Sequence, residues 1–425
     1  MQHITKKLKS NQNIFLTGGA GVGKTTTTRK IIREFEEEGK KVAKLASTGM
    51  AATLIGGQTL HSFFDLGIAD SLADLKMRGK LNTKKKIKKL IVSMDLIVID
   101  EISMVSAALL DMIEHRIVES GFAGSILVVG DFLQLPPVVK GYGGISFAFE
   151  SGSWHRFGFE TVTLTFNYRT EDAEFVNILN AVRFARVGEA EHLYLHNLIK
   201  PLAEDLSQYT FLYGKNASAS RHNRQQLAFI DSDELSFESQ VVRHDDSVQD
   251  DEIERFHNDA RIERLLCVKI GAPVLFTRNS WNYFNGERGR IVRVDNEKIF
   301  IEKSNGIIVK LERMGISKHK WKEVTIEGRK EMVEVALFTV YQYPIALAFA
   351  ITIHKSQGMS IDDLIIESNE IFAPSQFYVA LSRTISPHRL ILIQPSKDWR
   401  HLAFVHKKAL EFVQSNTSKN VYSQA

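Results

Sequence analysis

A glycine-rich motif near the start of the chain constrains its fold more than any other feature. Residues 18–25 read GGAGVGKT and match the pattern G-x-x-x-x-G-K-[ST]. The motif lies between an apolar run, Ile14 to Thr17, and an amphipathic stretch from about Lys24 to Glu38. Glycines let backbone N–H groups wrap around phosphates, and the following helix presents its positive N-terminal end to them. This order of strand, loop and helix predicts a nucleotide site at the end of a parallel sheet.

Further short apolar runs predict the rest of an α/β fold. Each is too short for a helix and is followed by a helix-like or loop segment, which is typical of parallel strands flanked by helices. One series continues the first sheet: Val42 to Leu45, Leu96 to Ile99 and Ser125 to Val129. A later series predicts a second sheet: Val162 to Thr165, Phe211 to Tyr213, Leu364 to Ile366 and Leu390 to Ile393. A chain of 425 residues is long enough for two such domains.

The second series of predicted strands is interrupted by a region with a different sequence pattern. From Gly271 to Tyr343, alternating apolar and polar runs are separated by Asn285-Gly286, Asp295-Asn296 and Asn305-Gly306. These are turn signals between antiparallel strands, so we expect a small β-barrel inserted into the second α/β domain, with Val333 to Tyr341 as one of its strands. Ahead of it, ten acids and one arginine between Asp231 and Glu254 predict an exposed connection.

Candidate catalytic residues follow the predicted strands of the first sheet. Ligands bind at the carboxyl ends of strands in open α/β sheets, so the two acids after Leu96–Ile99 are well placed. We expect Asp100 to hold Mg²⁺ together with Thr25, and Glu101 to orient the attacking water. Lys24 would bridge the β- and γ-phosphates of ATP.

Gln134 lies in a proline-limited segment after a further strand, in the sequence GDFLQLPP at residues 130–137. Its amide can donate to a γ-phosphate oxygen and accept from the attacking water. A loop glutamine that faces solvent is the alternative.

The distribution of charge is more informative than its sum. The net charge of +4 does not by itself indicate a nucleic-acid binder. However, Leu75 to Met94 contains eight lysines and arginines and no acid. This stretch either contacts nucleic-acid phosphates or forms a lysine-rich solvated helix with Leu81, Ile87 and Leu90 on its buried face.

Composition also narrows the class of protein. A single cysteine, Cys267, excludes a disulfide framework and a cysteine-based metal cluster. No run of about 18 apolar residues is present, and the first residues do not resemble a signal peptide. We therefore expect a soluble cytoplasmic protein without a membrane partner.

Several motifs go beyond a generic P-loop ATPase. In order along the chain they are STGMAA at 47–52, TLHSFF at 59–64, DEISM at 100–104, GDFLQLPP at 130–137, TIHKSQG at 352–358 and YVALSR at 378–383. This series resembles the motif set of superfamily 1B DNA helicases, closest to the PIF/RecD-like branch. The resemblance implies two RecA-like domains with ATP between them, single-stranded DNA across both, 5′-to-3′ translocation and an SH3-like barrel in the second domain.

The resemblance also implies domain bounds. Residues 1–155 would form the first RecA-like domain, with a small wedge at about 65–94. Residues 156–266 and 344–425 would form the second domain, and residues 267–343 the SH3-like barrel.

Particular residues carry over from these motifs. Arg169 and Arg383 resemble the arginine fingers of the second domain, Gly358 would approach the γ-phosphate, and Gln2 is the candidate adenine reader. The implied ATP-binding set is Gln2, Gly18, Gly19, Ala20, Gly21, Val22, Gly23, Lys24, Thr25, Thr26, Gln134, Arg169, Gly358 and Arg383. The implied DNA-binding set is Thr48, Gly49, Thr59, His61, Ser62, Phe63, Pro137, Thr352, His354, Lys355 and Ser356, with the Phe63 ring stacking on bases.

We therefore expect an ATP- and Mg²⁺-dependent 5′-to-3′ helicase that works as a monomer on single strands and single-strand/duplex junctions. A translocase that remodels nucleoprotein without unwinding shares every ATP-site residue and is the first alternative. A P-loop kinase of a small metabolite would not need His61, Lys355 or the β-rich insert. An ATP-gated binding module without turnover would not need Glu101 or Gln134.

Overall fold

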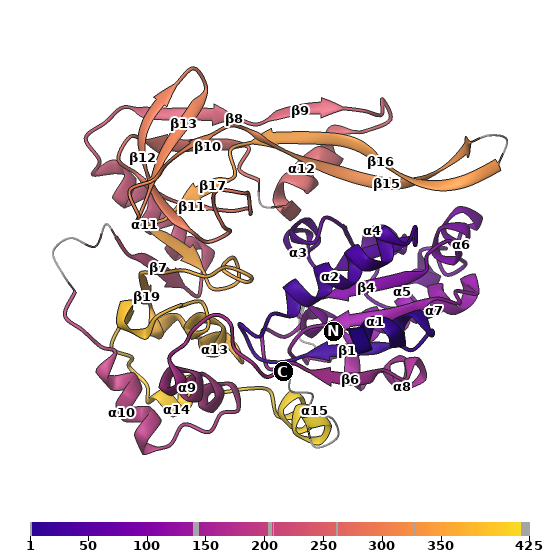
Figure 1. The fold of residues 1–425 in the computed structure, drawn as a ribbon, viewed down its shortest axis with the longest axis horizontal. Coiled ribbons are helices and arrows are strands. Elements are labelled where there is room, and N and C mark those ends of the chain that lie inside the picture. The colour runs from indigo at the N-terminus through magenta and orange to yellow at the C-terminus, as the bar shows by residue number, and fades with distance from the viewer. Residues whose placement is uncertain are drawn as a thin grey trace.

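The computed structural model describes residues 2–138, 144–202, 206, 208–260, 262–326 and 329–417. They form two α/β units and a β-rich insertion (Figure 1). The strands of the first unit are β1 (Ile14–Thr17), β2 (Val42–Ala46), β3 (Gln58–Thr59), β4 (Leu96–Asp100), β5 (Ser125–Val129) and β6 (Glu160–Thr163). They pair in parallel in the order β3-β2-β4-β5-β1-β6, which confirms the predicted α/β fold.

Helices cover both faces of this sheet, so its four inner strands, β1, β2, β4 and β5, are apolar along most of their length. Phe15 points into one core cluster, while its neighbours Ile14 and Leu16 point into the cluster on the opposite face. The helices of this unit are α1 (Gln2–Lys9), α2 (Lys24–Glu37), α3 (Gly49–Leu54), α4 (Leu60–Phe63), α5 (Leu72–Met77), α6 (Lys85–Val92), α7 (Ala107–Ser120) and α8 (Gly152–Phe157).

The second unit is a smaller parallel sheet with its own core. Its strands are β7 (Thr210–Tyr213), β18 (Ala350–Thr352), β19 (Leu364–Ile366) and β20 (Leu390–Leu392), in the order β18-β7-β19-β20. Its helices are α9 (Ala173–Arg183), α10 (Glu189–Asn197), α11 (Asn216–Ala228), α13 (Gln376–Leu381) and α14 (Trp399–Leu402). Three of the four predicted strands are confirmed.

The fourth, Val162 to Thr165, was assigned to the wrong sheet. Val162 lies in β6, which pairs with β1 at the edge of the first sheet. The predicted boundary at residue 155 therefore falls before the last strand of the first unit. A short apolar run carries no signal of which sheet it joins.

The insertion is antiparallel, as predicted, but its bounds are wider. One sheet has the order β14-β13-β12-β11-β17, and a separate ladder pairs β10 with β8. The ranges are β8 (Glu234–Glu238), β10 (Leu265–Lys269), β11 (Pro273–Phe276), β12 (Arg288–Asp295), β13 (Lys298–Lys303), β14 (Ile308–Leu311) and β17 (Ile345–Leu347). Since β8 and β17 pair inside it, the insertion spans about 234–347 rather than 267–343. Its SH3-like character stays a prediction.

A long hairpin replaces one predicted barrel strand. Val333 to Tyr341 lies in β16 (Arg329–Gln342), which pairs with β15 (Met314–Ile326) and with β9 (Gln240–Arg243). Figure 1 shows this hairpin extending above the first unit, next to α12 (Asp250–Ala260). Met332 packs into the core of the first unit. The hairpin is therefore an arm that links the insertion to the first sheet.

The acidic connection from Asp231 to Glu254 is exposed, as predicted, but it contains strands that its composition did not predict. Side chains of β8 and β9 are largely exposed, but their backbones pair with β10 and β16. Exposed edge strands can be highly charged, so charge alone does not exclude strand pairing.

The last described helix, α15 (Lys407–Thr417), returns to the first unit. Phe412 stacks on Phe149 with ring centroids 4.2 Å apart, and it also contacts Phe132 and Trp154. The predicted second domain, 344–425, therefore includes a helix that packs on the first; residues 418–425 lie outside the described residues. Among the described residues, no helix is both long and apolar enough to cross a membrane.

Candidate nucleotide and DNA sites

The predicted phosphate loop connects β1 to α2. Gly21 has φ +78°, and a Cβ there would lie 2.8 Å from the Arg169 Cβ, so this position requires glycine. The loop therefore packs directly against a segment of the second unit. Thr25 and Thr26 lie in the first turn of α2 and line a cavity of about 360 Å³ at the seam between the two units.

Lys24 is held by the loop that precedes it. Its Nζ donates hydrogen bonds to the carbonyl oxygens of Gly18 (2.8 Å) and Gly19 (2.7 Å). Burial lowers the pKa of Lys24, and the charges of Asp131, Glu101 and Asp100 oppose that shift. The ammonium group therefore sits among negative charges at the mouth of the loop.

The carboxyl end of β4 delivers the two predicted acids to the same cavity. Glu101 has a left-handed backbone (φ +53°), and its N–H donates to Asp100 Oδ1 at 2.9 Å. Burial raises the pKa of both carboxyl groups. For Glu101, burial and the charge of Asp100 raise the pKa to about 7. A carboxylate with this pKa is suited to accept a proton from water near neutral pH.

Gln134 lines the cavity from the loop after β5. It is buried, and its backbone N–H donates to the Asp131 carbonyl at 2.8 Å, which closes a tight turn. The alternative of a solvent-facing glutamine is therefore wrong.

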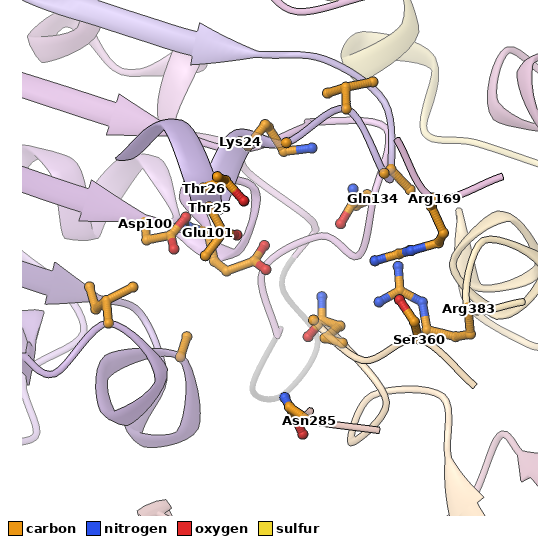
Figure 2. Close-up of a pocket in the computed structure, with 18 of the residues that line it drawn as sticks. Lys24, Thr25, Thr26, Asp100, Glu101, Gln134, Arg169, Asn285, Ser360 and Arg383 are labelled. Carbon is orange, nitrogen blue, oxygen red and sulfur yellow. Dashed lines mark hydrogen bonds between the residues drawn. The ribbon is translucent and has the colours of Figure 1, made fainter. Parts of the chain in front are cut away.

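Two arginines face these groups from the second unit. Figure 2 shows the guanidinium groups of Arg169 and Arg383 side by side, across the cavity from Lys24 and Glu101. Arg169 Nη1 donates to the Ser382 carbonyl, and Arg383 Nε donates to the Val379 carbonyl at 2.9 Å. Burial and the neighbouring charge of Arg169 lower the pKa of Arg383 to about 9. An anion between the two units would relieve this crowding of positive charge.

The cavity brings together most of the predicted ATP-binding set. Gly18 and Gly19 lie behind it, bonded to Lys24, while Gly358 lines it with φ +77°. Gln2 does not line it: the side chain is exposed at the start of α1. The resemblance implied that Gln2 reads adenine, and its exposed position outside this cavity does not support that role.

Some lining residues were missed. They are Arg29, Ala51, Ile55, Tyr168, Asn279, Asn285, Gln357 and Ser360. Tyr168 is 65% exposed and lies between Asn167 and Arg169, so the motif that contains Arg169 could have indicated it as a lining residue. Asn285 was read only as part of a turn; Figure 2 shows it opposite the phosphate loop, below Ser360. No local sequence pattern indicates that an insertion loop reaches this cavity.

The predicted DNA-binding residues lie in two places. Thr48 and His354 line the nucleotide cavity itself. Thr59, His61 and Ser62 line a groove between the first unit and the hairpin, which we call the hairpin groove. Its opposite wall contains Glu252, Arg255 and Asp259 of α12 and Lys318, His319, Lys320 and Trp321 of β15. Gly49 packs against Asp259, because a Cβ on Gly49 would lie 2.5 Å from the Asp259 carbonyl oxygen.

Several side chains assigned to DNA are buried instead. Phe63 also borders the hairpin groove, but its ring is only 1% exposed and packs edge-on against Phe64, so the structure does not support the expectation that it stacks on bases. Ser356 is fully buried and donates its hydroxyl to the Ile353 carbonyl. Thr352 is buried and accepts from the Lys355 N–H. Pro137 is also buried. Lys355 itself is partly exposed, so it remains a predicted DNA-binding residue.

The basic stretch forms α5 and α6, with several of its charges paired. Nζ–carboxylate distances are 2.7 Å for Lys84–Asp65, 2.9 Å for Lys88–Glu119 and 2.7 Å for Lys89–Glu323. Leu90 is buried, and Leu81 and Ile87 pack against the same core. The solvated-helix interpretation is therefore correct for the apolar face, while Lys86 reaches the hairpin groove.

A phosphate loop, two acids and a glutamine on one parallel sheet, opposed by two arginines from a second, define a P-loop ATPase with paired RecA-like domains. Comparison with known proteins gives the family. The model of the PIF1-like helicase family matches residues 2–191. A Campylobacter jejuni protein named ATP-dependent DNA helicase Pif1 is 38% identical over 410 residues, covering 92% of this chain and 91% of its own length. The chain belongs to the PIF1-like helicase family.

Solved structures agree over the full chain. Bacteroides Pif1 in complex with ADP-AlF4 matches with a TM-score of 0.83 at 27% identity, covering 99% of this chain and 96% of that one. Bacteroides Pif1 bound to single-stranded DNA matches with a TM-score of 0.65 at 28% identity, covering 100% and 98%. Unliganded Bacteroides Pif1 also matches with a TM-score of 0.83 at 27% identity. The chain is therefore more similar to these two DNA-free structures than to the DNA-bound one.

Proposed function

We propose that this chain is an ATP-dependent DNA helicase that moves 5′ to 3′ along a single strand by closing and reopening the seam between its two sheet units. The observation that carries the proposal is the shared cavity. Lys24, Asp100 and Glu101 of the first unit face Arg169 and Arg383 of the second across it. Turnover of a nucleotide bound there would depend on the distance between the units.

Within the cavity the roles follow from chemistry. Lys24 and the loop amides bind the phosphates, Glu101 accepts a proton from the attacking water, and Gln134 contacts the γ-phosphate and that water. The guanidinium groups of Arg169 and Arg383 stabilise charge on the transferred phosphoryl group, because they stay protonated and match its oxygens bidentately. Tyr168, exposed beside Gly23, offers a flat face to the base in place of Gln2.

The donor set near the loop fits Mg²⁺. Thr25 and Asp100 line one cavity and present a hydroxyl and a carboxylate, the hard oxygen ligands that Mg²⁺ prefers. A bound Mg²⁺ would neutralise phosphate charge.

The DNA track would begin on the first unit and end on the second. Thr48, Thr59, His61 and Ser62 lie on the first, and His354 and Lys355 on the second. When the seam closes, the two points at which the units hold the strand come closer together. When the seam reopens, the strand advances. Separating one base pair requires about 1.4 kcal/mol on average, well below the free energy of ATP hydrolysis in cells.

The substrate would be a single strand next to a duplex, with α5 and α6 as candidates for the separating wedge. The described residues of one chain supply every group that this cycle uses, so we propose a monomer as the catalytic unit. The second candidate is a translocase that remodels nucleoprotein; it would use the same cavity but no wedge.

Strand displacement on tailed duplexes tests the proposal. Wild type should unwind a 5′-tailed duplex at least tenfold faster than a 3′-tailed one, and Lys24→Ala should unwind neither. Equal rates on both tails would contradict the polarity. Strong stimulation of ATP hydrolysis by oligothymidine without unwinding of either duplex would favour the translocase.

A further inference from the structure

A buried ion pair joins the two units behind the phosphate loop. Arg183, the last residue of α9, donates from Nε to Asp131 Oδ2 (2.9 Å) and from Nη2 to Asp131 Oδ1 (2.8 Å). The side chains are 9% and 0% exposed. Asp131 follows β5 of the first sheet, whereas α9 packs into the core of the second unit through Phe175, Ile178 and Val182. The bidentate pair therefore crosses the seam.

The same carboxylate organises the turn that presents Gln134. Asp131 Oδ1 also accepts from the Leu133 N–H at 3.1 Å, and the Asp131 carbonyl accepts from the Gln134 N–H at 2.8 Å. Leu135 continues into the core of the second unit. A shift of Arg183 that keeps this ion pair therefore moves Asp131 and, with it, the backbone that carries Gln134.

A second contact fixes the neighbouring loop. The Ala20 N–H of the phosphate loop donates to Tyr378 Oη of α13 at 2.7 Å. A Cβ on Gly19 would lie 3.3 Å from that oxygen and 3.9 Å from Arg183 Nε. The second unit thus touches both the turn of Gln134 and the phosphate loop at adjacent points.

We propose that Arg183 is a positioning residue for ATP hydrolysis: through its ion pair with Asp131 it couples the position of Gln134 to the position of the second unit. Arg183 is separate from Arg169 and Arg383, since its guanidinium is bonded to Asp131 and does not line the nucleotide cavity. This inference rests on the proposed role of Gln134 at the γ-phosphate. Arg183 acts on the geometry of the hydrolysis step, so its loss lowers kcat more than it raises KM for ATP.

A cycle of variants tests the inference. Arg183→Met should lower the kcat of oligothymidine-stimulated ATP hydrolysis by 10- to 100-fold and change KM for ATP less than threefold. Arg183→Lys keeps the charge, should recover part of the rate, and takes the place of Arg183→Met throughout should that variant not fold. Gln134→Ala should also lower kcat, and Gln134→Ala/Arg183→Met should be no slower than Gln134→Ala alone. Losses that multiply in the double variant would overturn the inference.

Two controls separate positioning from stability. Arg389 makes a pair of the same geometry with Asp363 inside the second unit, with both contacts at 2.9 Å. Arg389→Met should leave kcat per folded molecule within twofold of wild type. Asp131→Asn/Arg183→Met removes both buried charges, so it should regain thermal stability relative to Arg183→Met but keep the low kcat. Recovery of kcat together with stability would show that the pair is only structural. A Gln134→Ala variant with normal kcat would instead contradict the proposed function.

Discussion

Glu101 shows how a single residue acquires its chemistry from its neighbours. Burial and the adjacent Asp100 raise its pKa, and a left-handed backbone turns it away from the line of β4 into the cavity. The sequence predicted its position, because a pair of acids at a strand end is a local pattern. Asn285 was not predictable in this way, since it reaches the cavity from about 185 residues further along the chain.

Phe63 shows that a motif match does not determine whether a single side chain is exposed. It lies in a helix of four residues, too short for periodicity to show which side faces the core. Phe63→Ala should therefore lower the free energy of unfolding by about 3–5 kcal/mol, as expected for a buried phenylalanine. Chemical denaturation measures this change. Affinity for oligothymidine per folded molecule should stay within about twofold, and a selective decrease in affinity would restore the stacking role.

At the scale of elements, the strands that build the two sheets were the most predictable parts. The inner strands of the first sheet are short apolar runs because helices cover both faces of a parallel sheet, whereas its edge strands β3 and β6 are mostly polar. The hairpin of β15 and β16 was missed, since alternation of apolar and polar residues describes a barrel strand and a projecting strand equally well. Its position over the first unit depends on contacts such as Lys89–Glu323, which are 234 residues apart.

The basic helices α5 and α6 offer a test of DNA contact at this scale. Replacing Lys84, Lys85 and Lys86 together by Ala should reduce the slope of log K against log[salt] for single-stranded DNA. The expected reduction is about 0.7 for each phosphate that the variant no longer neutralises. Fluorescence anisotropy at several salt concentrations measures the slope. Equal slopes for the two proteins would leave α6 as a solvated helix only.

Helix α15 should stabilise the first unit, although it follows the second in sequence. Phe412→Ala removes a ring that stacks on Phe149 and contacts Trp154, so unfolding should become easier by about 2–4 kcal/mol. Phe229→Ala is the matched control, because that ring is 82% exposed and its removal should change stability by less than about 0.5 kcal/mol. Denaturant midpoints of the two variants decide the point. An unchanged midpoint for Phe412→Ala would show that α15 is only loosely attached.

For the whole molecule, the seam between the units unites the ATP site, the Asp131–Arg183 pair and part of the DNA track. Arg169 and Arg383 reach the cavity only because the second unit is placed against the first. No local pattern in the sequence fixes that placement; the resemblance of ordered motifs predicted it. The contacts between the hairpin and the first unit depend on the same placement of the units. These contacts lie beside the hairpin groove, which His61 lines.

The most direct test of the whole account is the rate of ATP hydrolysis with and without oligothymidine, in wild type and in Arg169→Ala/Arg383→Ala. We expect oligothymidine to accelerate wild type strongly, and the double variant to lose at least about 10³-fold in kcat and most of the stimulation. A double variant that keeps DNA-stimulated turnover near the wild-type rate would contradict the claim that closure of the seam drives the enzyme.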